Sequence, residues 1–466
     1  MFSFLDNVCD GKLLVEDDGS ELFYDDLYKF GQKFREIIPS RSLILCLCKN
    51  NQESLLAYLT SIECKIVPIL LESGTNIDQI KNIINSYKPE FIWIPNANKD
   101  LFKDFDFEFE YKNYILLSKK NLNVRKLDKN LALLLSTSGS TGSPKFVRLS
   151  YKNLESNASS ISEYLSINKK EKPITVLPMS YSFGLSIINS HIINGCTILM
   201  TTKSIMQKDF WEFFKINEAT SISGVPYTFE ILLKLGFLKM HLPHLKTITQ
   251  AGGSLKKELV KEFSDYSTKN NKKFFVMYGQ TEATARMSYL PPEQSSEKLE
   301  SIGIPIPKGS FEIMDDNNKL VSEDNVEGEL VYKGPNVSMG YANNLEDLSK
   351  PDINKGILYT GDIAKKDSDD FYYIVGRKNR FIKVYGNRIN LDDTEKLLKS
   401  IVDDVACKGI DDNLEIYFVG PEKVDILKRF IKDKTSINSH AISYIEVNEI
   451  PKTSAGKIKY TELGRS

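Results

Sequence analysis

The chain has 466 residues, of which 41% are hydrophobic and 26% are charged, close to the averages for a soluble globular protein. These values exclude the disordered, collagen-like and disulfide-scaffold classes, and the length suggests roughly three domain-sized units. Lysine and arginine number 61 against 62 for aspartate and glutamate, which leaves a formal net charge of -1. This balance gives no general attraction for nucleic acid or anionic lipid, so any ligand must be recognised at a local site.

The six cysteines are scattered and show neither a C-x-x-C pair nor zinc-ligand spacing with histidines. We therefore expect buried thiols in a reducing compartment. The N-terminus lacks a basic stretch followed by an apolar core, and the longest apolar runs are too short to cross a bilayer. A cytoplasmic protein without a membrane span is expected.

From about residue 40, short apolar runs alternate with longer mixed segments. The first series contains SLILCLC, a helical stretch near 52–63, KIVPILL, the helical NIDQIKNIINSY and EFIWI. The second contains the helix YKNLESNASSISEYL, the strand PITVLP, the helix SIINSHIING and the strand CTILMTT. This alternation predicts βαβ units around largely parallel sheets.

After about residue 300, short strand-like pieces are separated by Gly, Asn and Asp. GELVYKG and GILYTGDIAKKDSDDFYYIVG predict antiparallel hairpins with DSDD as a turn, and LDDTEKLLKSI predicts a later helix with acidic residues in its first turn. The fold class expected is α/β. Residues 1–378 would form a large N-terminal domain with parallel βαβ sheets and a small β-rich subdomain, and residues 379–466 a small α+β C-terminal domain.

The most informative segment is a loop rich in Gly, Ser and Thr that follows the apolar strand predicted over 131–135 and precedes a predicted helix. The loop consists of Ser136, Thr137, Ser138, Gly139, Ser140, Thr141, Gly142, Ser143, Pro144 and Lys145. Converging backbone N–H groups, hydroxyls and a lysine suit phosphate oxygens. A Ser/Gly run is also typical of a flexible linker, but its position between strand and helix favours a triphosphate-binding loop. It is not a Walker A motif, which requires G-x-x-x-x-G-K-[ST], so a P-loop NTPase is not expected.

Four further segments carry chemistry. MYGQTEAT combines an aromatic face that suits a purine with a hard carboxylate that suits Mg²⁺. LYTGDIA contains an acceptor-only carboxylate suited to ribose hydroxyls. GRKNRFIKVYGNRIN is basic, and PKTSAGKIKYTEL places a lysine beside a glycine near the C-terminus. Taken alone, YGQTE is more typical of a strand end, and each lysine or arginine is more typical of a solvated surface charge.

Together these motifs resemble those of the adenylate-forming superfamily of acyl-CoA synthetases, luciferases and peptide-synthetase adenylation domains. Its phosphate loop reads [ST]-[ST]-G-[ST]-T-G-x-P-K, which residues 137–145 match almost residue for residue. The resemblance implies that ATP and AMP contact Thr137, Ser138, Gly139, Ser140, Thr141, Gly142, Lys145, Gly252, Gly253, Tyr278, Gly279, Thr281, Asp362, Arg377 and Arg388. It implies Glu282 and Thr141 as Mg²⁺ ligands, and Lys457, Glu282, Thr281 and Lys383 as catalytic residues.

The resemblance also implies a two-step reaction. A carboxylic acid would attack the α-phosphate of ATP to give an acyl-adenylate and pyrophosphate, with Lys457 bridging carboxylate and phosphate. The small C-terminal domain would then turn about a hinge at Asn379, where the family usually has Asp or Lys, and Lys383 would serve thioester formation. Coenzyme A is the expected acceptor. The alternatives are a carrier-protein phosphopantetheine as acceptor, and a non-catalytic nucleotide-binding homologue, although a pure binder would not need Lys457.

The acid itself is constrained by LPMSYSFGL, which resembles the family's L-P-x-x-H-x-x-G stretch. The acyl-pocket residues implied are Tyr181, Phe183, Gly184 and Tyr227, although core packing explains the three aromatic residues equally well. Amino-acid-activating members carry an aspartate where this chain has Gly184. An ammonium would be left unpaired there, so an acid with an uncharged tail is expected.

Overall fold

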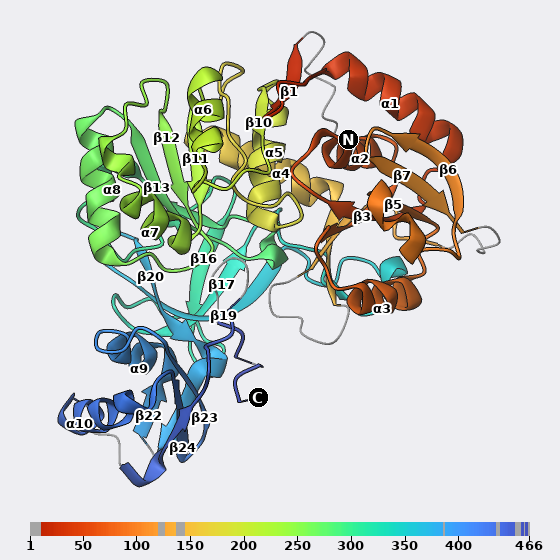
Figure 1. The fold of residues 1–466 in the computed structure, drawn as a ribbon. Coiled ribbons are helices and arrows are strands. Elements are labelled where there is room, and N and C mark those ends of the chain that lie inside the picture. The colour runs from red at the N-terminus through yellow and green to blue at the C-terminus, as the bar shows by residue number, and fades with distance from the viewer. Residues whose placement is uncertain are drawn as a thin grey trace. The chain divides into compact units, whose positions relative to one another are not determined.

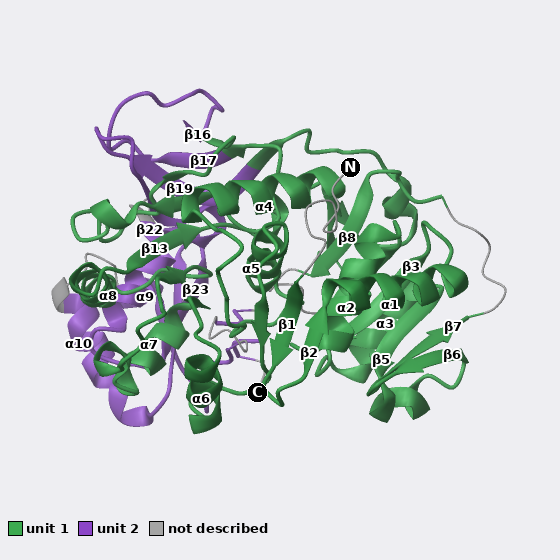
Figure 2. Ribbon diagram, turned by 90° about the horizontal axis from the view of Figure 1, so that it is seen from above, with its two compact units in different colours: residues 1–311, 332–358 green, residues 312–331, 359–466 purple. Residues whose placement is uncertain are grey.

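The computed structural model describes residues 11–119, 126–136, 145–384, 387–434, 439–452, 458–460 and 462–464. The chain divides into two compact units: unit 1 comprises Met1–Phe311 and Tyr332–Leu358, and unit 2 comprises Glu312–Val331 and Tyr359–Ser466 (Figure 2). The boundary predicted at residue 378 falls inside unit 2. This boundary stays a prediction, because it marks the proposed hinge, and a division of the chain by compactness does not test where the chain turns.

The largest sheet of unit 1 has eight strands in the order β18-β9-β8-β4-β3-β5-β7-β6. Its strands are β3 (Leu43–Cys48), β4 (Val67–Glu72), β5 (Phe91–Pro95), β6 (Asp106–Tyr111), β7 (Tyr114–Ser118), β8 (Leu131–Ser136), β9 (Phe146–Ser150) and β18 (Tyr341–Ala342). The four central strands are parallel, and β9 and β7 pair antiparallel with the outer two of them. The predicted βαβ units are confirmed, because α2 (Gln52–Glu63) connects β3 to β4 and α3 (Ile77–Tyr87) connects β4 to β5.

Strand β3 shows why its sequence is an unbroken apolar run. Alternate residues of the strand enter two different clusters, Ile44, Cys46 and Cys48 in the one that contains α2, and Leu43, Leu45 and Leu47 in the one that contains α3. Figure 1 shows α2 and α3 on opposite sides of these strands, with α1 (Tyr24–Ile37) beside α2. Both faces are covered, so neither set of side chains can be polar.

The second sheet of unit 1 has the order β11-β12-β13-β14-β15, with the first three strands parallel and the last two antiparallel. Its elements are β11 (Ser221–Gly224), β12 (Thr247–Gln250), β13 (Lys273–Tyr278), β14 (Ser288–Leu290) and β15 (Ile304–Pro305), with α6 (Lys208–Ile216), α7 (Pro226–Lys234) and α8 (Lys257–Lys269). A three-stranded sheet joins β10 (Ile198–Met200), β1 (Lys12–Glu16) and β2 (Glu21–Phe23).

The second predicted series is confirmed except for one strand. The helices are α4 (Tyr151–Leu165) and α5 (Ser182–Ile192), and CTILMTT contains β10. PITVLP, however, forms only isolated bridges from Pro173 and Ile174. Neighbouring residues of the segment bond different strands, since the Ile174 N–H donates to the Ser221 carbonyl and the Thr175 N–H donates to the Leu199 carbonyl. The segment therefore makes isolated bridges rather than a continuous ladder with one partner.

Unit 2 holds most of a four-stranded sheet in the order β16-β17-β19-β20, a hairpin and a three-stranded sheet in the order β23-β24-β25. The elements are β16 (Ser310–Met314), β17 (Gly328–Lys333), β19 (Ile357–Lys366), β20 (Tyr372–Arg377), β21 (Phe381–Val384), β22 (Asn387–Asn390), α9 (Leu391–Leu398), β23 (Val405–Ile410), β24 (Asn413–Phe418), α10 (Val424–Lys434) and β25 (Ile442–Glu446). The DSDD turn is confirmed, because the Asp367 N–H bonds the Phe371 carbonyl at 3.0 Å and Asp370 has φ 63°. The α9 prediction is confirmed too, with Asn390 as its N-cap.

Short 3₁₀ helices complete the described secondary structure: η1 (Asn96–Leu101), η2 (Phe237–Lys239), η3 (Thr281–Ala283), η4 (Pro292–Gln294), η5 (Glu346–Ser349), η6 (Lys378–Arg380), η7 (Pro421–Lys423) and η8 (Ser439–Ala441). Within the described ranges, every helix is too short or too polar to span a lipid bilayer. The expected combination of a large α/β body with a small C-terminal α+β region is therefore confirmed.

Candidate active site

The predicted phosphate loop connects two paired strands. β8 and β9 are antiparallel, with Ser136 opposite Phe146, so the loop closes a hairpin. The prediction that the loop leads directly into a helix was wrong, because FVRLS forms β9 and α4 begins only at Tyr151. A buried arginine, Arg148, interrupts the apolar pattern of β9 and hides the strand from sequence reasoning. Thr137, Ser138, Gly139, Ser140, Thr141 and Gly142 lie outside the described residues, whereas Lys145 is described at the base of the hairpin.

Lys145 is linked to the predicted magnesium ligand Glu282 by Tyr341, a residue that the motifs did not single out. Its ammonium is 3.5 Å from the centroid of the Tyr341 ring, and the Tyr341 hydroxyl donates a 2.6 Å hydrogen bond to Glu282 Oε1. Burial, followed by the Glu282 carboxylate, raises the pKa of Tyr341, so the phenol remains a donor. Tyr341 is placed there because β18 pairs with β9, Tyr341 opposite Val147. The segment SMGYA contains no signal that could have revealed this role.

The segment after β13 is held by a tight backbone turn. An added Cβ at Gly279 would lie 1.8 Å from the carbonyl oxygen of Ala285, so only glycine permits this approach. Thr284 has φ 68° and ψ -54°, and the Ala285 N–H bonds the Ala283 carbonyl at 2.7 Å, which defines a strained γ-turn. The Thr284 hydroxyl is held by the Asn336 carbonyl at 2.7 Å. These constraints fix the backbone next to Glu282.

Thr281, predicted to contact the α-phosphate, is attached to α5. Its hydroxyl lies 3.1 Å from the hydroxyl of Ser182, a further residue that sequence reasoning missed although it stands inside the quoted LPMSYSFGL. Glu282 is half-buried, and its backbone carbonyl accepts from the Ser338 N–H at 2.8 Å. The described residues contain no cluster of three or more metal-binding side chains. Mg²⁺ is commonly held by one or two carboxylates together with substrate phosphates and water, so a single carboxylate such as Glu282 fits it.

The predicted adenine and acyl residues meet at the end of β12. Gly252 has φ 86°, and an added Cβ there would lie 2.9 Å from the Tyr181 hydroxyl. Gly253 accepts a 2.8 Å hydrogen bond from Gln250 Nε2. Tyr278 ends β13 and lies 6.4 Å from the Phe311 ring, centroid to centroid. Residues 251–255 (AGGSL) thus lie in the turn from β12 to α8, and the Tyr181 hydroxyl occupies the space beside Gly252.

The remaining acyl-pocket residues differ in their surroundings. An added Cβ at Gly184 would lie 2.2 Å from the Pro178 carbonyl oxygen, so this backbone has no space for the aspartate of amino-acid-activating members. Phe183 is buried, whereas Tyr227 is 54% exposed on α7. The structure brings Tyr181 to Gly252, and it leaves Tyr227 largely in solvent.

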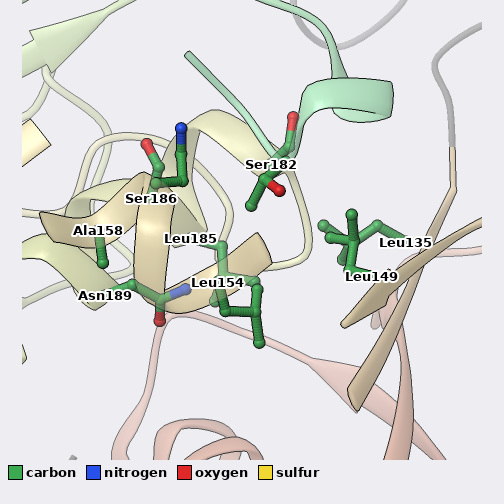
Figure 3. Close-up of a pocket in the computed structure, with 10 residues that line it drawn as sticks. Leu135, Leu149, Leu154, Ala158, Ser182, Leu185, Ser186 and Asn189 are labelled. Atoms are coloured by element: carbon green, nitrogen blue, oxygen red, sulfur yellow. The ribbon is translucent and has the colours of Figure 1, made fainter. Parts of the chain in front are cut away.

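A small cavity lies beside Ser182 between α4, α5 and the ends of β8 and β9 (Figure 3). Leu135 and Leu149 form its apolar side, and Ser182 and Ser186 of α5 also line it. Its volume is about 10 Å³. This is room for about one water molecule, so the cavity cannot hold an acid.

In unit 2, the predicted ribose residue Asp362 faces Arg377, which was predicted to contact the ribose or the phosphates. Asp362 on β19 is opposite Arg377 on β20, and Arg377 Nε lies 3.3 Å from Asp362 Oδ1. Asp362 is only 3% exposed, whereas Arg377 is exposed. The two motifs thus present a carboxylate and a guanidinium on one hairpin.

The predicted hinge residue has anchored neighbours. Asn379 lies in η6, where Lys378 Nζ bonds Glu329 Oε2 at 2.7 Å and Arg380 Nε bonds Asp392 Oδ1 at 2.7 Å. Lys383 is exposed on β21, opposite the backbone position of Arg388 on β22. The side chain of Arg388 and all of Lys457 lie outside the described residues.

Comparisons with known proteins identify the family of this chain. A family model described as AMP-binding enzyme matches residues 38–342, so the chain belongs to that family and the resemblance to adenylate-forming enzymes is confirmed. A 2-succinylbenzoate–CoA ligase of Oceanobacillus iheyensis is 24% identical, over 98% of this chain and 96% of its own. The luciferin 4-monooxygenase of Luciola mingrelica is 26% identical, over 84% of this chain and 73% of its own.

The fold is shared with a solved structure. The o-succinylbenzoate CoA synthetase of Bacillus subtilis in complex with its acyl-adenylate intermediate superposes with a TM-score of 0.78 at 21% identity, covering 98% of this chain and 95% of that one. At this identity the likeness concerns the fold alone.

Proposed function

We propose that this protein activates a carboxylic acid with ATP to an acyl-adenylate, releasing pyrophosphate, and transfers the acyl group to the thiol of coenzyme A. The observation that carries the proposal is the contact of Lys145 with Tyr341 and of Tyr341 with Glu282. Through Tyr341, Lys145 at the end of the proposed phosphate loop is linked to Glu282, the proposed Mg²⁺ ligand. A triphosphate bound at the loop would meet both charges.

In this mechanism, the chain acts by positioning and charge neutralisation rather than by a protein nucleophile. Thr137, Ser138, Gly139, Ser140, Thr141, Gly142 and Lys145 would hold the phosphates, and Glu282 with Thr141 would hold Mg²⁺, which neutralises phosphate charge when bound. Tyr278 would cover the adenine beside Gly252, Gly253 and Gly279. Asp362 and Arg377 would hold the ribose, Thr281 would contact the α-phosphate, and Lys457 would stabilise the reacting charges.

The second step rests on the C-terminal region. We propose that residues 379–466 turn as a small domain against residues 1–378 about Asn379, with Lys383 and Arg388 serving the thioester and nucleotide contacts. The two ion pairs that flank Asn379 support a pivot at this point, because each holds the chain firmly on one side of it. Relatives whose names identify them as CoA ligases support coenzyme A rather than a carrier-protein phosphopantetheine as acceptor. The scattered cysteines support the cytoplasm as its compartment.

The test is ATP–pyrophosphate exchange with Mg²⁺ across a broad panel of carboxylic acids, followed by thioester formation with coenzyme A and with a phosphopantetheinylated carrier protein. We expect acid-dependent exchange and a faster thioester step with coenzyme A. If no acid of the panel supports exchange while ATP still binds, the non-catalytic nucleotide-binding alternative would be established instead.

A further inference from the structure

Arg286 carries a buried positive charge that only neutral groups surround. The residue lies between η3 and β14 and is 2% exposed. Its Nε donates to Ser186 Oγ at 3.2 Å, and its Nη1 donates to the Tyr164 hydroxyl at 3.1 Å and to Met277 Sδ at 3.4 Å. Its guanidinium carbon is 5.1 Å from the centroid of the Phe183 ring. No carboxylate of the described residues forms an ion pair with it.

A second buried arginine, Arg148, is compensated by backbone carbonyls at its two Nη atoms, although its Nε has no hydrogen-bond partner among the described residues. Arg148 is fully buried and donates to three backbone carbonyls, those of Met339, Lys350 and Pro351, at 2.6, 2.6 and 3.2 Å. Carbonyl dipoles are fixed acceptors that compensate a buried cation. A hydroxyl that already donates elsewhere and a thioether compensate it less, and burying an uncompensated charge is costly. The charge of Arg286 is therefore available for a partner from outside the chain.

The groups around Arg286 are suited to an anion. The Ser186 hydroxyl donates to the Phe183 carbonyl at 2.7 Å, and the Tyr164 hydroxyl donates to Met277 Sδ at 3.1 Å, a weak acceptor that an anion would replace. Burial raises the pKa of Tyr164 although Arg286 acts in the opposite direction, so the phenol keeps its proton at neutral pH. Arg286 Nη2 forms no hydrogen bond to a described residue. It is not fully sealed from solvent either.

The position of this group coincides with the predicted acyl side of the site. Phe183 and Ser186 belong to α5, which also carries Gly184. Met277 immediately precedes Tyr278 on β13, the residue predicted to cover adenine. The guanidinium thus lies between the helix predicted to line the acyl pocket and the strand predicted to position the nucleotide.

We propose that Arg286 is a specificity residue that binds a second anionic group, a carboxylate, at the far end of the acid. This inference rests on the proposed function. It predicts an acid with a charged far end, whereas Gly184 alone predicts an acid with an uncharged tail. A planar guanidinium matches a carboxylate with two parallel hydrogen bonds. It also repels an ammonium, which agrees with the lack of space for an aspartate at position 184.

The experiment compares acids that differ only in the second carboxylate: butanoate with succinate, hexanoate with adipate and benzoate with terephthalate. Exchange kinetics are measured for the wild type, Arg286→Gln, Arg286→Lys and the control Arg429→Gln, which removes an exposed guanidinium from α10. We expect a diacid to be preferred over its partner by the wild type. Arg286→Gln should raise KM for that diacid about 10- to 100-fold and leave KM for ATP unchanged, Arg286→Lys should retain part of the preference, and Arg429→Gln all of it.

Calorimetric binding of the same acids in the presence of Mg²⁺ and α,β-methylene-ATP separates this inference from the proposed function. Binding of a diacid that Arg286→Gln abolishes, without exchange by any acid, would remove the proposed function and keep the role of Arg286. A preference for monoacids, or a diacid preference that survives in Arg286→Gln, would overturn it. If Arg286→Gln does not fold, Arg286→Lys and Tyr164→Phe take its place. A diacid preference that is unchanged in both of these variants would also overturn the role of Arg286.

Discussion

The residues that we propose for the nucleotide site are held in different ways in unit 1 and unit 2. In unit 1, Lys145, Glu282 and Tyr341 come from distant segments and are joined by direct contacts. In unit 2, Asp362 and Arg377 face each other on one hairpin. Unit 1 therefore keeps its site only while its tertiary packing is intact, whereas unit 2 presents its residues on local elements. Substitutions should separate phosphate and Mg²⁺ binding, which we propose for unit 1, from ribose recognition and the action of Lys457, which we propose for unit 2.

The largest effect is expected from Lys457→Ala. If the terminal lysine acts on the reacting charges, pyrophosphate exchange should fall about 10²- to 10³-fold. Calorimetric Mg·ATP binding should stay within about twofold of wild type, because the proposed binding residues Lys145, Glu282 and Asp362 are unchanged. Lys459→Ala is the matched control, because its ion pair with Glu462 is partly exposed and contributes little. A parallel loss of ATP binding would show that the two units do not divide the work in this way.

Gly279→Ala tests the packed backbone of unit 1. Its methyl group would collide with the Ala285 carbonyl, so we expect a loss of about 3 kcal/mol in the free energy of unfolding, measured by urea denaturation, together with weaker Mg·ATP binding. Gly74→Ala is the control, since no atom lies within 4 Å of its added Cβ. Equal stability of the two variants would contradict the close approach at Gly279.

Asp362→Asn tests the hairpin of unit 2. Loss of the charged acceptor should raise KM for ATP about tenfold, and it should reduce the difference between ATP and 2′-deoxy-ATP, because that difference reports the ribose contact. Asp370→Asn is a control on the same hairpin, at an exposed turn position whose φ of 63° asparagine tolerates. An undiminished difference between the two nucleotides would exclude a ribose role for Asp362.

The smallest effect is expected from Tyr341→Phe. This variant keeps the ring beside Lys145 and removes the hydroxyl that orients Glu282, so the Mg²⁺ concentration for half-maximal exchange should rise about threefold, given that Tyr341 is partly exposed. Tyr341→Leu should also raise KM for ATP, because the ring is lost. Tyr359→Phe, at an exposed tyrosine of unit 2, should change neither value. Identical behaviour of the Phe and Leu variants would argue against separate roles for hydroxyl and ring.

Local patterns predicted much of the fold. Alternating apolar runs and helical segments predicted β3, α2, β4, α3 and β5, since each strand is buried on both faces and each helix is amphipathic or buried. The DSDD turn and helix α9 with its acidic first turn were also predicted, because they depend on residues within a few positions. Two predictions failed where a local rule was overridden: Arg148 obscured β9, and PITVLP divides its backbone hydrogen bonds between two segments instead of forming a ladder with one.

By itself, the sequence determined the family and the order of its motifs, because those depend on residue identity and spacing. Only the tertiary structure decided that Tyr341 joins Lys145 to Glu282, that Pro178 leaves no space for a side chain at Gly184, and that Arg286 is buried among neutral groups. Each of these is a contact between separate segments. Such contacts follow from how helices and strands pack, which the periodicity of a single segment does not report.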